Sequence, residues 1–113
     1  MSELHSIAED LRFKALRGMQ AFDDAWTEGG IPRALELHGE SVIRAQVQYQ
    51  AAQDMEGVLR GAIPLDDLLR ELEGVATGSP ASCGRMGILA RSIASEEART
   101  ILARLTGEGA TEH

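Results

Sequence analysis

Residues 31–60 read IPRALELHGESVIRAQVQYQAAQDMEGVLR, and this stretch decides the fold. Its proline stands at the second place, where a helix accepts it readily, and Gly61 supplies a stop. The pattern predicts one helix of about thirty residues, roughly 45 Å long at about 1.5 Å per residue. A break near Gly39, with Ser41 as a new N-cap, is the alternative.

This central helix is apolar on two sides. Each residue advances about 100° around a helix axis, so two series of apolar residues fall on roughly opposite faces. The first is heptad-like and consists of Leu35, His38, Val42, Ala45, Tyr49, Ala52 and Leu59. The second consists of Ile43, Val47, Ala51, Met55 and Val58. Two apolar faces need two covers, and the rest of so short a chain must supply them.

A first helix precedes the central one. It begins at Ser2 or Ser6 and ends at Gly29-Gly30, where glycine terminates helices. Gly18 lies on its apolar stripe, where a missing side chain lets a neighbouring helix come close. The stripe recurs at steps of three and four and comprises Leu4, Ile7, Ala8, Leu11, Ala15, Met19, Phe22, Ala25 and Trp26.

Shorter helices follow. Pro64, with Asp66 and Asp67 in the first turn, opens a helix that buries leucines. Small residues form a linker over 74–84, and residues 85–106 return to helix, either as one segment or as two with Ser95 as a cap. The expected fold is all-α, a helical hairpin with a long central helix plus two or three shorter helices. Residues 1–106 form one domain, and 107–113 a flexible polar tail.

Association follows from this pattern, because about two turns of each face of the central helix would stay bare in a monomer. Contiguous exposed apolar patches mark partner surfaces, and two-fold dimers are the commonest oligomers. We therefore expect a homodimer that forms a bundle, and binding to another protein. The residues expected at the oligomer or partner interface are Ile43, Val47, Ala51, Met55, Val58 and Phe13.

Composition narrows the class of protein. Eighteen acidic and eleven basic residues give a net charge of −7, which disfavours a general nucleic-acid surface. One cysteine, Cys83, fits a reducing compartment. The first residues are acidic, unlike a secretion signal, and no apolar run reaches the roughly 18 residues of a membrane span. The expected location is the cytoplasm, without membrane attachment.

No catalytic, cofactor or metal constellation is visible in the sequence. The Glu-x-x-His pairs of di-iron bundles are missing. His5 and Glu9 are one turn apart and form a solvated pair, while His38 is expected in the core or an interface. Cys83 has a cation, Arg85, nearby, which favours a lowered thiol pKa, but no histidine or second cysteine adjoins it. We expect no cofactor, no metal and no enzyme activity.

The leading hypothesis is a non-enzymatic interaction protein that acts as a homo-oligomer: an adaptor, a chaperone-like accessory factor, an inhibitor or an antiactivator. A second hypothesis rests on residues 89–102, which resemble the helix-turn-helix of bacterial repressors. That resemblance implies a DNA-binding regulator using residues 85–106, with DNA contacts from Arg85, Arg91, Arg99 and Arg104. Its supposed reading helix, however, opens with Glu96 and Glu97. A third hypothesis is an acidic inhibitor that mimics nucleic acid.

Overall fold

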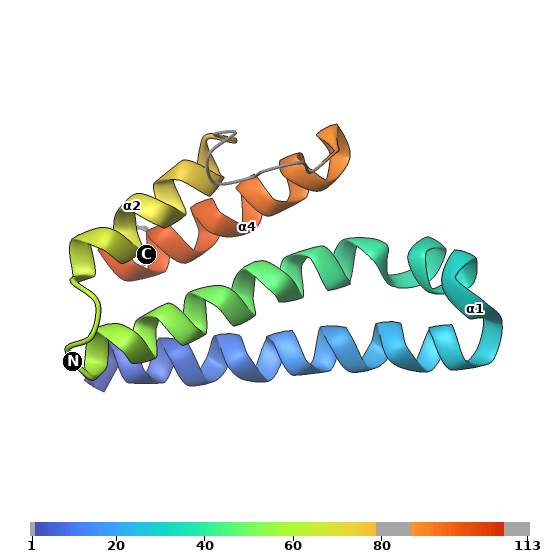
Figure 1. Ribbon diagram of the computed structural model, residues 1–113, viewed down its shortest axis with the longest axis horizontal. Coiled ribbons are helices and arrows are strands. Elements are labelled where there is room, and N and C mark those ends of the chain that lie inside the picture. Colours follow the sequence, from blue (N-terminus) through green and yellow to red (C-terminus); the bar gives the residue numbers. More distant parts are fainter. Residues whose placement is uncertain (1, 79–86, 108–113) are drawn as a thin grey trace.

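The computed structural model describes residues 2–78 and 87–107 and shows an all-helical chain. The described residues form the helices α1 (Ser2–Leu59), α2 (Leu65–Ala76) and α4 (Ile88–Thr106). The described ranges contain no strand. The predicted all-α class and the predicted hairpin are therefore confirmed (Figure 1). The tail expected over 107–113 and most of the linker expected over 74–84 lie outside the described residues.

Helix α1 is a hairpin rather than one rod. At Gly30 the backbone leaves helical geometry with φ 80° and ψ −178°, a region open to glycine and closed to residues with a Cβ. The chain reverses there, and residues 2–29 and 31–59, the first and second arms, run antiparallel (Figure 1). The Gly29-Gly30 stop and the restart at Pro32 were both predictable.

Two predicted alternatives are wrong. The second arm continues through Gly39 without a break, and residues 88–106 form one helix that does not restart at Ser95. Ser95 acts between helices instead, since its hydroxyl donates to the Val75 carbonyl at 2.8 Å. Arg99 Nη1 donates to the Ala76 carbonyl at 3.1 Å. Carbonyls at the end of α2, which an isolated helix leaves unpaired, are thus satisfied by α4.

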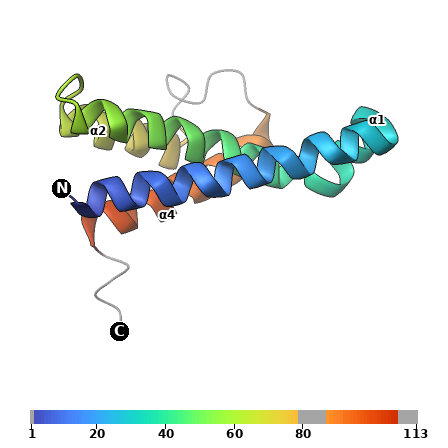
Figure 2. The ribbon, with the colours of Figure 1, turned by 90° about the horizontal axis from the view of Figure 1, so that it is seen from below.

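Helices α2 and α4 lie against the base of the hairpin, where Ser2 and Leu59 are. The tip around Gly30 projects beyond them as a pair of helices (Figures 1 and 2). The largest fully buried side chains are Leu11, Met55, Leu68 and Ile101. One comes from each arm, one from α2 and one from α4, so the main core is a four-helix core confined to the base.

The arms approach closely along a seam of small residues. A Cβ added to Gly18 would lie 3.1 Å from the Cβ of Ala45 and 3.2 Å from the carbonyl oxygen of Ser41. This confirms the prediction that Gly18 admits a neighbouring helix. Ala15, Ala34 and Ala52 are fully buried in the structure. Small side chains therefore set the distance between the arms along most of the hairpin.

Candidate interaction surfaces

The tip of the hairpin has small residues inside and large ones outside. Between residues 16 and 45 the only buried hydrophobic residues are Ala25, Ala34 and Ala45. Five large apolar side chains in the same region are about half exposed, namely Leu16, Trp26, Ile31, Leu35 and Leu37. A protein core normally takes the large apolar side chains first. Large apolar side chains on the outside are typical of helices that pack against a further element.

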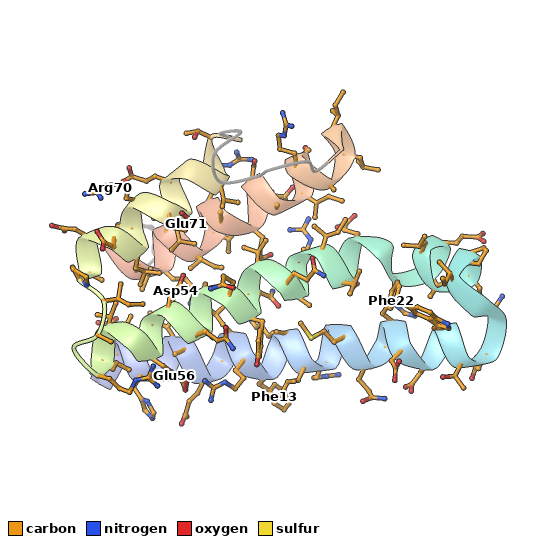
Figure 3. All side chains as sticks on the ribbon, viewed as in Figure 1. Phe13, Phe22, Asp54, Glu56, Arg70 and Glu71 are labelled. Atoms are coloured by element: carbon orange, nitrogen blue, oxygen red, sulfur yellow. The ribbon has the colours of Figure 1, made fainter. Side chains whose placement is uncertain are left out.

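Most of these side chains lie along one line. Arg12 forms an ion pair with Glu56 across the two arms, and Figure 3 shows Glu56 on the side away from α2 and α4. Residues seven apart share a helix face, so this side continues toward the tip. We call the resulting surface the hairpin stripe; it consists of Leu16, Met19, Trp26, Leu35, Val42 and Tyr49. Each of these side chains is partly or largely exposed.

The Arg12–Glu56 ion pair marks the base end of the hairpin stripe. The hydrogen bond from Arg12 lowers the pKa of the Glu56 carboxyl below its ordinary value, and the pKa of Arg12 is raised by the same contact. Both side chains thus stay charged across the neutral range. At the other end, Phe22 and Trp26 meet edge to face with their centroids 6.0 Å apart. The stripe is apolar between an ion pair and an aromatic pair.

A second surface lies where the second arm meets α2. There an apolar hollow of about 160 Å³ has a floor of aliphatic side chains and a rim of amides and carboxylates. We call it the α1–α2 groove; its floor is Ile43, Val47, Ala51, Leu72 and Val75, and its rim is Gln46, Gln50, Asp54 and Glu71. Figure 3 shows Asp54 and Glu71 between the second arm and α2.

The residues expected at an interface therefore divide among three places. Ile43, Val47 and Ala51 are brought together in the α1–α2 groove. Val58 is half-buried against the core. Phe13 is 61% exposed on the side away from α2 and α4, with the Arg17 guanidinium 5.7 Å from its ring centroid (Figure 3).

Met55 requires a correction. Its side chain is fully buried in the chain's own core, so in this fold it has no surface to offer a partner. The second apolar face of the central helix is covered at its base end by α2 and α4. The bare surface lies instead along the hairpin stripe and in the groove.

A polar cluster ties α4 to the second arm. Arg44 Nη1 donates to Glu97 at 3.2 Å, and Nη2 donates to Glu96 and to Glu40 at 3.0 Å each. Gln48 adds a hydrogen bond of 3.1 Å to the other oxygen of Glu97. Burial disfavours the charged form of Arg44, but the three carboxylates outweigh it and its pKa is raised. The cluster holds α4 in place at the edge of the tip.

Two of the arginines assigned to DNA, Arg99 and Arg104, contact other helices of the chain. Arg99 caps α2, and Arg104 Nη1 lies 2.6 Å from Asp10 Oδ2 on the first arm. Arg91 lines a polar hollow beside Gly78 with Ser92, and Arg85 lies outside the described residues. The continuous α4 lacks the turn that the helix-turn-helix resemblance needs. The resemblance to a repressor motif is thereby wrong.

The other candidate groups from the sequence are the histidines, Glu9 and Cys83. His5 and Glu9 form the expected exposed pair at 3.0 Å, and His38 is half-buried in the second arm. Within residues 2–78 and 87–107, no three histidines, cysteines or carboxylates gather as a metal site. In the same ranges, no helix has the length and hydropathy to cross a membrane. Cys83 and His113 fall outside these ranges.

Searches of protein-family models, curated proteins and solved structures gave no match to this chain. The hairpin stripe and the α1–α2 groove are therefore the features that indicate a function. The sequence pattern had already placed Ile43, Val47 and Ala51 of the groove floor on one helix face. It did not predict which side of the hairpin would stay uncovered. A signal for it existed, because Arg12, Met19 and Trp26 repeat every seven residues on one arm, as Leu35, Val42, Tyr49 and Glu56 do on the other.

Proposed function

We propose that this protein is a non-enzymatic interaction module that works as a homodimer, with the hairpin stripe as its self-association surface. The inverted packing of the tip carries the proposal, because alanines fill the inside while Leu16, Trp26 and Leu35 stay about half exposed. A second hairpin laid against the stripe would convert each two-helix tip into a four-helix bundle. Such a dimer would act as an adaptor, an accessory factor, an inhibitor or an antiactivator through its helix faces.

The composition of the surface suits a dimer, because it has apolar side chains at its centre and charged ones at its edge. Stable interfaces bury about 800 Å² on each partner, with an apolar centre and a polar rim. The stripe runs from Leu16 to Trp26 on one arm and from Leu35 to Tyr49 on the other, and the Arg12–Glu56 pair lies at its edge. The single tryptophan of the chain stands within it, and tryptophan is enriched among residues that dominate binding energy.

Two charge substitutions test the assignment. Leu35 and Leu37 are 55% and 52% exposed, but two positions apart on a helix they point to nearly opposite sides. In a two-fold dimer, Leu35→Glu buries two carboxylates, one from each copy. We therefore expect the free energy of association to become less favourable by about 2–4 kcal/mol, which raises Kd by a factor of roughly 30 to 1,000. Leu37→Glu is the matched control and should leave Kd within about threefold.

Sedimentation equilibrium gives the Kd of each variant, and circular dichroism verifies that both remain helical. The assignment fails if Leu37→Glu dissociates the protein while Leu35→Glu does not, since the other side of the tip would then be the interface. It also fails if both variants and the parent sediment as single chains at high micromolar concentration.

A further inference from the structure

By itself, the apolar hollow of the α1–α2 groove is smaller than a typical ligand pocket and large enough for one side chain. Pockets that hold drug-sized molecules enclose about 300–1,000 Å³, whereas this hollow has about 160 Å³. A cavity of about 150 Å³ lined by aliphatic groups accepts benzene. The groove therefore has room for a single large aliphatic or aromatic side chain, which is the form of an anchor residue in a protein interface.

The floor of the groove follows a helical rhythm. Ile43, Val47 and Ala51 stand four residues apart along the second arm, and Leu72 and Val75 face them from α2. At about 1.5 Å per residue, the span from 43 to 51 is roughly 12 Å, or about two turns of helix. Grooves between two helices commonly accept the apolar face of an amphipathic helix. A third helix is the occupant that matches this floor.

The charge around the groove selects the chemistry of that helix. Its lining has carboxylates from Asp54 and Glu71 and contains no lysine or arginine. A neighbouring hollow of about 290 Å³ continues from it toward the start of α2 and adds Asp67, whose carboxylate pairs with Arg70. Among the described residues, neither Asp54 nor Glu71 forms an ion pair with a basic side chain, while Gln50 donates to Asp54 at 3.1 Å. The end of the groove nearest Asp67 is therefore acidic beside an apolar floor.

From this juxtaposition we propose that the α1–α2 groove docks a basic amphipathic helix of another protein. The helix inserts one large aliphatic side chain between Val47 and Leu72, and its lysines or arginines lie over Asp54 and Glu71. Complementary charge raises association rates and selects among partners, and the net charge of −7 acts in the same direction. The inference names the partner class that the proposed function leaves open and rests on that function, but it uses a different surface.

Two labelled 15-residue helical peptides test the proposal against the full chain. Both have leucine at every third or fourth position; one has lysines on its flanks and the other has glutamates. Fluorescence anisotropy at about 50 mM salt should show at least tenfold tighter binding of the lysine peptide. Replacing its central leucine with serine should weaken binding at least fivefold, because the anchor is then lost.

Matched protein variants separate the groove from general attraction to an acidic protein. Asp54→Asn with Glu71→Gln removes two charges at the rim, and we expect binding of the lysine peptide to weaken about tenfold. Asp66→Asn with Glu73→Gln removes two charges from exposed positions of α2 that do not line the groove, and it should change binding less than twofold. Equal losses in the two double variants would mean non-specific attraction and would overturn the proposal.

Sedimentation of the rim variant distinguishes this proposal from the dimer. If neutralising Asp54 and Glu71 alters the dimer Kd more than threefold, a second copy covers the groove and the docking proposal is wrong. If the chain is monomeric and still prefers the lysine peptide through its rim, the groove assignment holds while the dimer assignment fails. Absence of lysine-peptide binding up to about 1 mM refutes the groove assignment outright.

Discussion

Replacing Arg44 should weaken the packing of α4 against the second arm, because the Glu97 carboxylate then loses its cationic partner. The Glu97 side chain is only 11% exposed, and Arg44 is 25% exposed. Breaking a fully buried ion pair by removing one partner costs about 3–5 kcal/mol. Water reaches part of Arg44, and Gln48 still donates to Glu97. We therefore expect Arg44→Met to lower the free energy of unfolding by about 2–3 kcal/mol.

A second substitution tests whether the uncompensated charge is the cause. Glu97→Gln in the Arg44→Met background removes that charge, keeps the hydrogen-bonding shape and should restore about 1–2 kcal/mol. The matched control is Arg70→Met, which breaks the exposed 3.4 Å pair of Arg70 with Asp67. Exposed pairs contribute little, so this change should cost less than about 0.5 kcal/mol.

Urea unfolding followed by circular dichroism measures all four proteins. Each is held at the same protein concentration, because the stability of an associating protein depends on it. The reasoning is refuted if Arg44→Met costs no more than Arg70→Met. It is equally refuted if Glu97→Gln lowers stability further in the Arg44→Met background, since Glu97 would then contribute without needing its cation.

Three other substitutions test the turn, the second arm and the acid response. Gly30→Ala forces a Cβ onto a residue with φ 80° and should lower the free energy of unfolding by about 1–3 kcal/mol. Gly39→Ala places its Cβ 4.0 Å from Leu35 Cδ2 and should raise the free energy of unfolding by about 0.5–1 kcal/mol. Urea midpoints that move in the same direction for both variants would contradict this. The hydrogen bond from Arg104 chiefly lowers the pKa of Asp10 below 3.8, against a smaller opposing effect of burial. A lowered carboxyl pKa stabilises the fold above the ordinary value, and the gain is lost as pH falls through the folded pKa. Arg104→Gln should therefore cost up to about 1 kcal/mol at pH 6, since both partners are over a third exposed, and less at pH 2.5. A constant difference between these pH values would exclude the mechanism.

The hairpin and its limits were predictable because they rest on local rules. Helix ends and restarts were predicted at Gly29-Gly30, Pro32 and Gly61. Gly18 indicated the close approach of the arms. Interactions within one helix, such as the His5–Glu9 pair, were predictable for the same reason. These features depend on residues close in sequence, where spacing alone fixes the geometry.

The choice of covered face was not predictable in this way. Leu35, Val42 and Tyr49 are as apolar a series as Ile43, Val47 and Ala51, so composition could not say which one α2 and α4 would contact. One clue was available, since Arg44 and Gln48 share a face with the buried Ala51 and Met55. Polar residues on a core face imply polar partners from another helix, but naming Glu97 and Glu96 required coordinates.

The roles of Ser95 and Arg99 illustrate the same limit. In sequence, Ser95 before two glutamates has the form of a helix N-cap, and an arginine-rich segment suits phosphates. In the structure both side chains bind carbonyls at the end of α2, about twenty residues away in sequence. Capping by another helix leaves no local pattern, so the cap and the DNA contact were both reasonable from sequence alone.

Dilution of the unmodified protein tests self-association through the hairpin stripe most directly. Trp26 is the only tryptophan, and it is 48% exposed in the single chain. Sedimentation and tryptophan emission are recorded on the same samples from about 100 μM to 0.1 μM. We predict a mass falling from twice 12.2 kDa to 12.2 kDa, with emission shifting to longer wavelength at the same concentrations as Trp26 meets water. A doubled mass that dissociates without any change in Trp26 emission, or a mass of 12.2 kDa throughout, would contradict the account.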